Sequence, residues 1–195
     1  YAAAKERLFA MQDNHWAVIA TDDPVTTAIA DRRRGKLQRV SMADGTERQH
    51  GWPSLQGPHN RQNANVATAV ASQLGVDATA IELALQSYPG LPHRMERVGE
   101  VGGVAFVNDS KATNAEAAAP ALAAFRAVRW ILGGRAKTAE LDACMPHLGH
   151  VRSAYTIGEA GPMLAQLLRP RLPVTEAGTL DRAVAAAAAD AQGGD

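Results

Sequence analysis

The seven residues 108–114, Asn-Asp-Ser-Lys-Ala-Thr-Asn, place a carboxylate, an ammonium, two hydroxyls and two amides in one short segment. They follow the apolar run 104–107 and precede an alanine-rich stretch, so the pattern predicts a buried strand turning into a helix. In open α/β sheets, ligands bind at that edge. Asp109 can accept hydrogen bonds from hydroxyls and Lys111 can neutralise an anion, which predicts phosphate or sugar binding.

A structural interpretation explains only part of this segment. Thr113 and Glu116 have the spacing of a capping box, and Asn108 suits a turn. Capping leaves residues 109–111 unexplained. We therefore favour a functional site here.

Two amides, Asn60 and Asn63, lie one turn apart on a predicted helix. A side-chain amide offers both a donor and an acceptor, which suits the edge of a purine. On spacing alone, the favoured alternative is an N-cap at Asn60 and a partly buried polar residue at Asn63.

Two further cations, Arg94 and Lys137, lie beside segments that are expected to be neither helix nor strand. Arg94 lies on a suspected linker, where it can reach a ligand held between domains, although an isolated arginine in a linker is more often simply solvated. Lys137 follows a predicted strand and the pair Gly133-Gly134, so it can reach over the sheet edge. The chain contains no G-x-x-x-x-G-K-[ST] phosphate loop, so that motif gives no argument for ATP binding.

Lys5 lies one helical turn from Tyr1 and Phe9, and these aromatic neighbours would favour its neutral amine. A neutral lysine can react with carbon dioxide to form a carbamate, which acts as a carboxylate towards a metal. The sequence alone favours a lysine whose stem packs along apolar neighbours. The six histidines include no pair at metal-ligand spacing.

The elements that must position these residues fall into two blocks, with a domain boundary expected at residues 89–92, Pro-Gly-Leu-Pro. For residues 1–90 we expect helices to about 13 and at 24–33, strands at 16–20 and 36–42, a hairpin and loop at 43–58, and then two helices. The expected stripes of these two helices are Asn63, Ala67, Val70 and Leu74, and Ile81, Ala84, Leu85 and Tyr88, with Gly75 ending the first and Asp77 capping the second.

Residues 91–195 alternate strand and helix. Strands are expected at 104–107, 128–132, 153–157 and 173–175, and helices within 114–125, 139–148, 162–168 and 180–191. Pro120 would disrupt a regular helix if it lay in the middle, so the regular helix within 114–125 is expected to begin only at Pro120. This alternation predicts an α/β fold whose second block is Rossmann-like with a mostly parallel sheet.

Composition narrows the class of partner. The 195 residues carry 20 basic and 20 acidic side chains, so no overall field recruits nucleic acid or an anionic membrane. No apolar run approaches the roughly 20 residues that span a bilayer, and the single cysteine excludes an internal disulfide. We expect a cytoplasmic protein that acts on small molecules. The chain starts inside a helix without Met and ends after a helix stop, so we expect a fragment of a longer protein.

Five motifs occur in order: Tyr-Ala-Ala-Ala-Lys at 1–5, Gly-x-His-Asn-x-x-Asn at 57–63, Leu-Pro-His-Arg-x-Glu at 91–96, the segment 108–114, and Gly-Gly-x-x-Lys at 133–137. Together they resemble the Mur ligase family over residues 1–137. Relatives that add other amino acids, and the folylpolyglutamate synthetases, usually carry an Asp-x-x-His type turn where this chain has residues 109–111. The difference points to the glutamate-adding branch.

The resemblance implies an ATP-dependent amide ligase that adds D-glutamate to UDP-N-acetylmuramoyl-L-alanine (UDP-MurNAc-L-Ala) through an acyl phosphate, in peptidoglycan precursor synthesis for the bacterial cell wall. It implies ATP and Mg2+ and a monomer in the cytoplasm. The roles it implies are a carbamylated Lys5 on magnesium, Asn60 and Asn63 on adenine, Arg94 and Asp109 on the ribose or phosphates, Lys111 on the phosphate or acyl phosphate, and Thr113 and Lys137 on D-glutamate.

By the same resemblance, residues 1–90 would be the C-terminal part of a central ATP-binding domain, and residues 91–195 a truncated C-terminal ligase domain. The family's phosphate loop, metal-binding acid and histidine, and UDP-binding domain would precede Tyr1, and a glutamate-binding segment would follow Asp195. We expect the 195 residues alone to be inactive. The alternatives are another Mur ligase, a ligase like folylpolyglutamate synthetase, or a non-catalytic nucleotide-binding module.

Overall fold

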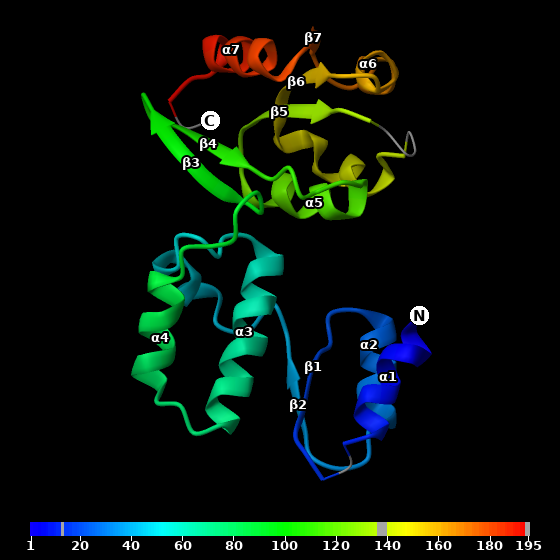
Figure 1. Cartoon of the computed structure of the whole chain (residues 1–195), viewed down its shortest axis with the longest axis vertical. Helices are drawn as coiled ribbons and strands as arrows, with labels where there is room; N and C mark the ends of the chain where they lie inside the picture. Colours follow the sequence, from blue (N-terminus) through cyan, green and yellow to red (C-terminus); the bar gives the residue numbers. More distant parts are fainter. Residues whose placement is uncertain (13, 136–139, 194–195) are drawn as a thin grey trace. The chain divides into compact units, whose positions relative to one another are not determined.

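The computed structural model describes residues 1–12, 14–135 and 140–193. The chain divides into two compact units, Tyr1–Pro89 and Gly90–Asp195 (Figure 1). Each unit builds its own core, so each is described by itself.

The first unit contains two parallel strands and four α-helices among its described residues. The elements are α1 (Ala2–Ala10), β1 (Ala17–Ala20), α2 (Pro24–Arg32), β2 (Leu37–Val40), a 3-10 helix η1 (Thr46–Gly51), α3 (Pro58–Gln73) and α4 (Ala78–Ser87). Ala17 lies opposite Leu37 at the start of the parallel pair. The carboxylate of Asp77 accepts hydrogen bonds from the first turn of α4, which confirms the predicted cap.

The hairpin expected within residues 43–58 is wrong, because this stretch folds into turns and the 3-10 helix η1. Trp52 is buried and anchors the segment in a cluster with Leu55. The side-chain amide of Gln49 donates to the carbonyl oxygens of Leu55 and Gly57, at 2.5 and 2.7 Å. A buried glutamine thus satisfies carbonyls that a hairpin would have paired across strands.

The predicted inner stripe of α3 is also wrong, since Asn63, Ala67, Val70 and Leu74 are all exposed. The buried positions of α3 are Ala64 and Ala69. Ala64 packs in the same cluster as Trp52 and the α4 residues Ile81 and Leu85. Alanine contributes little to hydrophobic periodicity, so the inward face of α3 was set by its large neighbours and not by its own pattern.

The second unit contains a three-stranded parallel sheet in the order β5-β6-β7, which confirms the expected α/β fold with mostly parallel strands. Its elements are β3 (Glu96–Val101), β4 (Val104–Asn108), α5 (Ala115–Ala124), β5 (Val128–Gly133), a 3-10 helix η2 (Asp142–His150), β6 (Val151–Ile157), α6 (Gly161–Leu168), β7 (Val174–Gly178) and α7 (Leu180–Asp190). None of the described helices of either unit is long and apolar enough to span a membrane.

An antiparallel hairpin, β3 with β4, precedes the parallel sheet, and the sequence prediction missed β3. Val101 pairs with Val104 across Gly102 and Gly103. Both glycines have positive φ, the combination that a two-residue type I′ turn requires. This hairpin ends at Asn108, directly before the polar residues 109–114.

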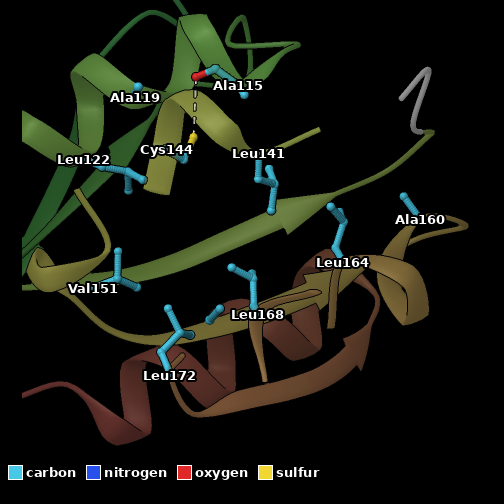
Figure 2. Packing of buried hydrophobic residues seen from close by; sticks show 11 residues of the cluster. Ala115, Ala119, Leu122, Leu141, Cys144, Val151, Ala160, Leu164, Leu168 and Leu172 are labelled. Atoms are coloured by element: carbon cyan, nitrogen blue, oxygen red, sulfur yellow. Dashed lines mark hydrogen bonds between the residues drawn. The ribbon is translucent and has the colours of Figure 1, made fainter. Parts of the chain in front are cut away.

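Helices cover both faces of the parallel sheet. On one face, α5, η2 and α6 pack around Ala154 of β6, and Figure 2 shows the side chains of this cluster. On the other face, Ala183 and Ala187 of α7 pack against Tyr155 of β6. The neighbours Ala154 and Tyr155 are both fully buried, as expected for a central strand whose successive side chains point to opposite faces.

The lone cysteine, Cys144, belongs to this core. Its thiol is buried and donates to the carbonyl of Ala115 at 3.4 Å, the dashed line in Figure 2. Burial, with a smaller contribution from Glu116, raises the pKa of Cys144 to about 11. The thiol therefore stays protonated near neutral pH and links η2 to the start of α5.

Candidate functional site

Two polar loops of the second unit are joined by hydrogen bonds. One is residues 90–95, before β3, and the other is residues 109–114, after β4. The backbone N–H of Lys111 donates to the carbonyl of His93 at 3.0 Å. The N–H of Met95 donates to the carboxylate of Asp109 at 3.0 Å. Arg94 and Lys111, predicted from separate motifs, therefore belong to adjoining loops.

Asp109 holds the second loop in shape. Its side chain is half-buried and uses Oδ1 to accept from Met95, while its carbonyl accepts from the N–H of Ala112 at 2.8 Å. A carboxylate tied in this way can still offer its second oxygen to a ligand hydroxyl. The predicted nucleotide contact of Asp109 is compatible with its structural role and stays a prediction.

Arg94 and Lys111 carry the positive charge of these two loops. Both side chains are exposed. Within the described part of the chain, no carboxylate forms an ion pair with either of them. Two cations on bonded loops, neither of them ion-paired among the described residues, suit an external anion with several oxygens, such as a phosphate chain.

The predicted capping box at Thr113 is wrong. Helix α5 begins at Ala115, and its N-cap is Asn114, whose side-chain oxygen accepts from the N–H of Ala117 at 2.8 Å. Thr113 is exposed and lies before the cap, which leaves its hydroxyl available to a ligand. The expected late start of the helix is also wrong, because Pro120 lies inside α5. A proline at the sixth helical position loses one hydrogen bond, and the packed face of α5 offsets that loss.

The end of β5 forms a second part of the candidate site. Gly133 has φ of 138°, and a Cβ there would lie 2.1 Å from the carbonyl oxygen of Ile157, so the position requires glycine. The N–H of Gly134 donates to the same carbonyl at 2.9 Å. These contacts bind the loops after β5 and β6 together at the carboxyl edge of the sheet, where ligands bind in open α/β sheets. Lys137, the predicted D-glutamate contact, lies outside the described residues.

In the first unit, the predicted adenine contacts both lie on α3. The N-cap of α3 is Gly57 and not Asn60, since Pro58 begins the helix. Asn60 is half-buried and donates from Nδ2 to the carbonyl of Gln56 at 3.0 Å, so its Oδ1 is the group left for a ligand donor. Asn63 is exposed, one turn further along. The structure thus places the two amides on one helix, at the predicted spacing.

Lys5 lies on α1 in the first unit, and its side chain is exposed. Its ammonium lies 5.4 Å from the centroid of the Tyr1 ring, a cation–π distance. The aromatic neighbour expected from sequence is therefore present, and the role of Lys5 stays a prediction. Among the described residues, no group of three His, Cys, Asp or Glu side chains could hold a metal ion.

Sequence reasoning missed Asp22, at the carboxyl end of β1. Its carboxylate accepts from Ser41 Oγ at 2.8 Å, from Met42 N at 2.9 Å and from Gln62 Nε2 at 2.6 Å. Burial acts to raise the pKa of Asp22, but these hydrogen bonds outweigh it and hold the pKa below its usual value. The signal was available, since Asp22 lies two residues after an apolar strand, as Asp109 lies two residues after the apolar run 104–107.

The second unit and the whole chain both match known proteins. A family model described as "Mur ligase, glutamate ligase domain" matches residues 93–195. The UDP-N-acetylmuramoylalanine–D-glutamate ligase of Zymomonas mobilis is 55% identical over 195 residues, covering 98% of this chain and 44% of that protein. The enzyme of the same name from Novosphingobium aromaticivorans is 50% identical over 201 residues, covering 100% of this chain and 45% of that protein. The chain thus spans a little under half the length of these relatives.

A solved structure gives an independent comparison of the fold. The crystal structure of MurF from Acinetobacter baumannii covers 96% of this chain, and this chain covers 54% of it, with a TM-score of 0.55 and 19% sequence identity. At that identity the likeness concerns the fold alone.

Proposed function

Because the chain belongs to the Mur ligase family through its glutamate ligase domain, we propose that it is part of an ATP-dependent ligase that joins D-glutamate to UDP-MurNAc-L-Ala. The observation that carries the proposal is the shared name of the curated relatives, which match almost the whole chain at 50% identity and above. The turn at residues 109–111 supports the choice of D-glutamate, as argued from the sequence.

The reaction forms an amide from a carboxylate and an amine, which requires activation of the carboxylate. In the proposed sequence, the alanyl carboxylate takes up the terminal phosphoryl group of ATP, the amine of D-glutamate attacks the acyl phosphate, and phosphate leaves. Arg94 and Lys111 would hold the phosphate oxygens, because both are exposed cations on bonded loops. Their contribution is charge stabilisation and positioning.

The remaining residues are assigned to the nucleotide and to D-glutamate. Asn60 and Asn63 would contact adenine from α3, and Asp109 would accept from a ribose hydroxyl. Thr113 and Lys137 would hold D-glutamate. These assignments are supported by residue type and motif order, and for Thr113 also by its exposed position ahead of the Asn114 cap.

ATP fits the residues present better than a magnesium site does. The exposed cations suit phosphates, whereas the described residues contain no cluster of metal-binding side chains. A carbamylated Lys5 would supply one carboxylate-like ligand to Mg2+, and the other ligands would have to come from outside the described residues. The proposed protein is a cytoplasmic monomer whose partners are ATP, D-glutamate and UDP-MurNAc-L-Ala.

A direct test uses the full-length protein and measures phosphate release. The proposal predicts release only when ATP, UDP-MurNAc-L-Ala and D-glutamate are all present, and loss of release when any one is omitted. Phosphate release that is independent of both the nucleotide-sugar and the amino acid would contradict a ligase. The 195 residues alone should release none, because the sequence contains no phosphate loop.

A further inference from the structure

His93 adopts a backbone conformation that a residue with a side chain rarely takes. Residues 91–94 form a tight turn closed by a hydrogen bond from Arg94 N to Leu91 O at 3.2 Å. Pro92 occupies its second position and His93 its third, with φ of 63°. These are the features of a type II turn, whose third position normally takes glycine or asparagine. A histidine there is strained, so its surroundings must hold it in place.

Three contacts hold His93 in this conformation. Its N–H donates to Glu96 Oε2 at 2.8 Å, and its carbonyl accepts from Lys111 N at 3.0 Å. Its ring Nδ1 lies 2.9 Å from Nδ2 of Asn108. The partners come from the start of β3, the end of β4 and the loop 109–114. His93 therefore joins the turn 91–94 to the β3–β4 hairpin and to the loop 109–114.

The hydrogen bonds of Asn108 determine which nitrogen of that ring carries the proton. A backbone N–H, that of Ser110, donates to Asn108 Oδ1 at 3.1 Å, so the oxygen of the amide faces Ser110. The Nδ2 group must then face His93 and Glu96, from which it lies 2.9 and 3.5 Å. Nδ2 can only donate, so Nδ1 of His93 must accept. In the neutral ring, the proton is therefore on Nε2.

We propose that His93, as the neutral Nε2–H tautomer, is a positioning residue that orients Arg94 and Lys111 towards the phosphates of the nucleotide. Arg94 is the next residue along the chain, and Lys111 is bonded to the carbonyl of His93. Because both cationic side chains are exposed, the backbone at His93 sets the points from which they project. The inference rests on the proposed function, which assigns a phosphate chain to these cations.

The tautomer can be tested without any activity. Long-range 1H–15N NMR of the 195-residue chain at mildly alkaline pH should show His93 with its proton on Nε2. Replacing Asn108→Asp substitutes an acceptor for the donor, so His93 should change to the Nδ1–H tautomer. An Nδ1–H ring in the unaltered chain, or a tautomer that does not respond to Asn108→Asp, would show that Asn108 does not fix the tautomer of His93 and would overturn the proposal.

The positioning role is tested in the full-length enzyme. His93→Gly permits the backbone conformation but removes the ring, and should raise the KM for ATP about fivefold, the effect of losing one hydrogen bond between neutral groups. His93→Asn tolerates positive φ and retains a side-chain acceptor, so it should recover most of the affinity. His50→Asn is the matched control, an exposed histidine of the first unit that should leave the KM unchanged.

Arg94→Ala separates this inference from the proposed function. If Arg94→Ala leaves the KM for ATP unchanged, the proposed phosphate contact is wrong. If Arg94→Ala weakens ATP binding and His93→Gly does not, the contact stands and the positioning role of His93 is refuted. Both variants are expected to weaken it.

Discussion

The hydroxyl of Tyr155 donates a hydrogen bond of 2.7 Å to the carboxylate of Asp190, and so fastens the end of α7 to the middle strand of the parallel sheet. The same oxygen accepts from Ser153 Oγ at 2.9 Å. Tyr155 is fully buried, whereas Asp190 is exposed. The buried hydroxyl of Tyr155 thus both donates and accepts a hydrogen bond. The bond to Asp190 exists only while the hydroxyl keeps its proton, so this contribution to the stability of the second unit depends on pH.

Tyr155→Phe should lower the free energy of unfolding by about 1 kcal/mol, because it removes both hydrogen bonds and little else. Urea denaturation followed by circular dichroism measures this change. Tyr88→Phe is the control, since Tyr88 is an exposed residue of the first unit and its replacement should have no effect. Equal losses from the two replacements would contradict the assigned role.

The same tyrosine predicts a pH dependence. Burial, and then the bond to Asp190, raise the pKa of Tyr155 above its ordinary value of 10.0. A raised pKa favours the protonated folded state, so this stability is fully present below pH 10.0 and is lost as the pH rises through the higher folded value. The free energy of unfolding should therefore fall more steeply above pH 10.0 in the unaltered chain than in Tyr155→Phe. Parallel pH profiles would count against the shift.

Gly133→Ala should destabilise the second unit by about 3 kcal/mol. The new methyl group would lie 2.1 Å from the carbonyl oxygen of Ile157, and the φ of 138° is itself unfavourable for alanine. Gly149→Ala provides the control, because a Cβ at Gly149 meets nothing within 4 Å and no positive φ is involved. Thermal unfolding should separate the two variants clearly. Similar melting temperatures would show that the edge of the sheet can relax around the added group.

Asn114→Ala should cost about 1 kcal/mol of stability, the usual effect of removing an N-cap side chain. Thr113→Ala should leave stability nearly unchanged, because Asn114 and not Thr113 accepts from the first turn of α5. In the full-length enzyme the order should reverse, with Thr113→Ala raising the KM for D-glutamate. Destabilisation by Thr113→Ala instead would restore the capping box that the sequence suggested.

The parallel sheet could be predicted from the sequence, whereas the strand β3 could not. Residues 128–132 and 153–157 are rich in β-branched and aromatic side chains and are separated by helical segments, and parallel strands have that pattern. The strand β3 contains Arg97, Gly99 and Glu100 and is almost wholly exposed. It becomes a strand because it pairs with β4, a tertiary contact that its own composition does not indicate.

The candidate site shows the same division. The residue types at 108–114 indicated an anion site, because so many polar groups followed a buried strand. The tie between Lys111 and His93 depends on the left-handed backbone at His93, and propensity assigns such a conformation to glycine or asparagine. The sequence motifs therefore predicted Arg94 and Lys111 as separate candidates. They could not show that the two loops are joined by the hydrogen bond from Lys111 N to His93 O.

The choice of amino acid is the most direct test of the proposed D-glutamate ligase. The full-length protein would be supplied with ATP, UDP-MurNAc-L-Ala and equal concentrations of D-glutamate, L-lysine and meso-diaminopimelate, and the products would be identified by mass spectrometry. A D-glutamate ligase should give a single nucleotide product, heavier than the substrate by one glutamyl residue. A product that carries lysine or diaminopimelate in its place would contradict it.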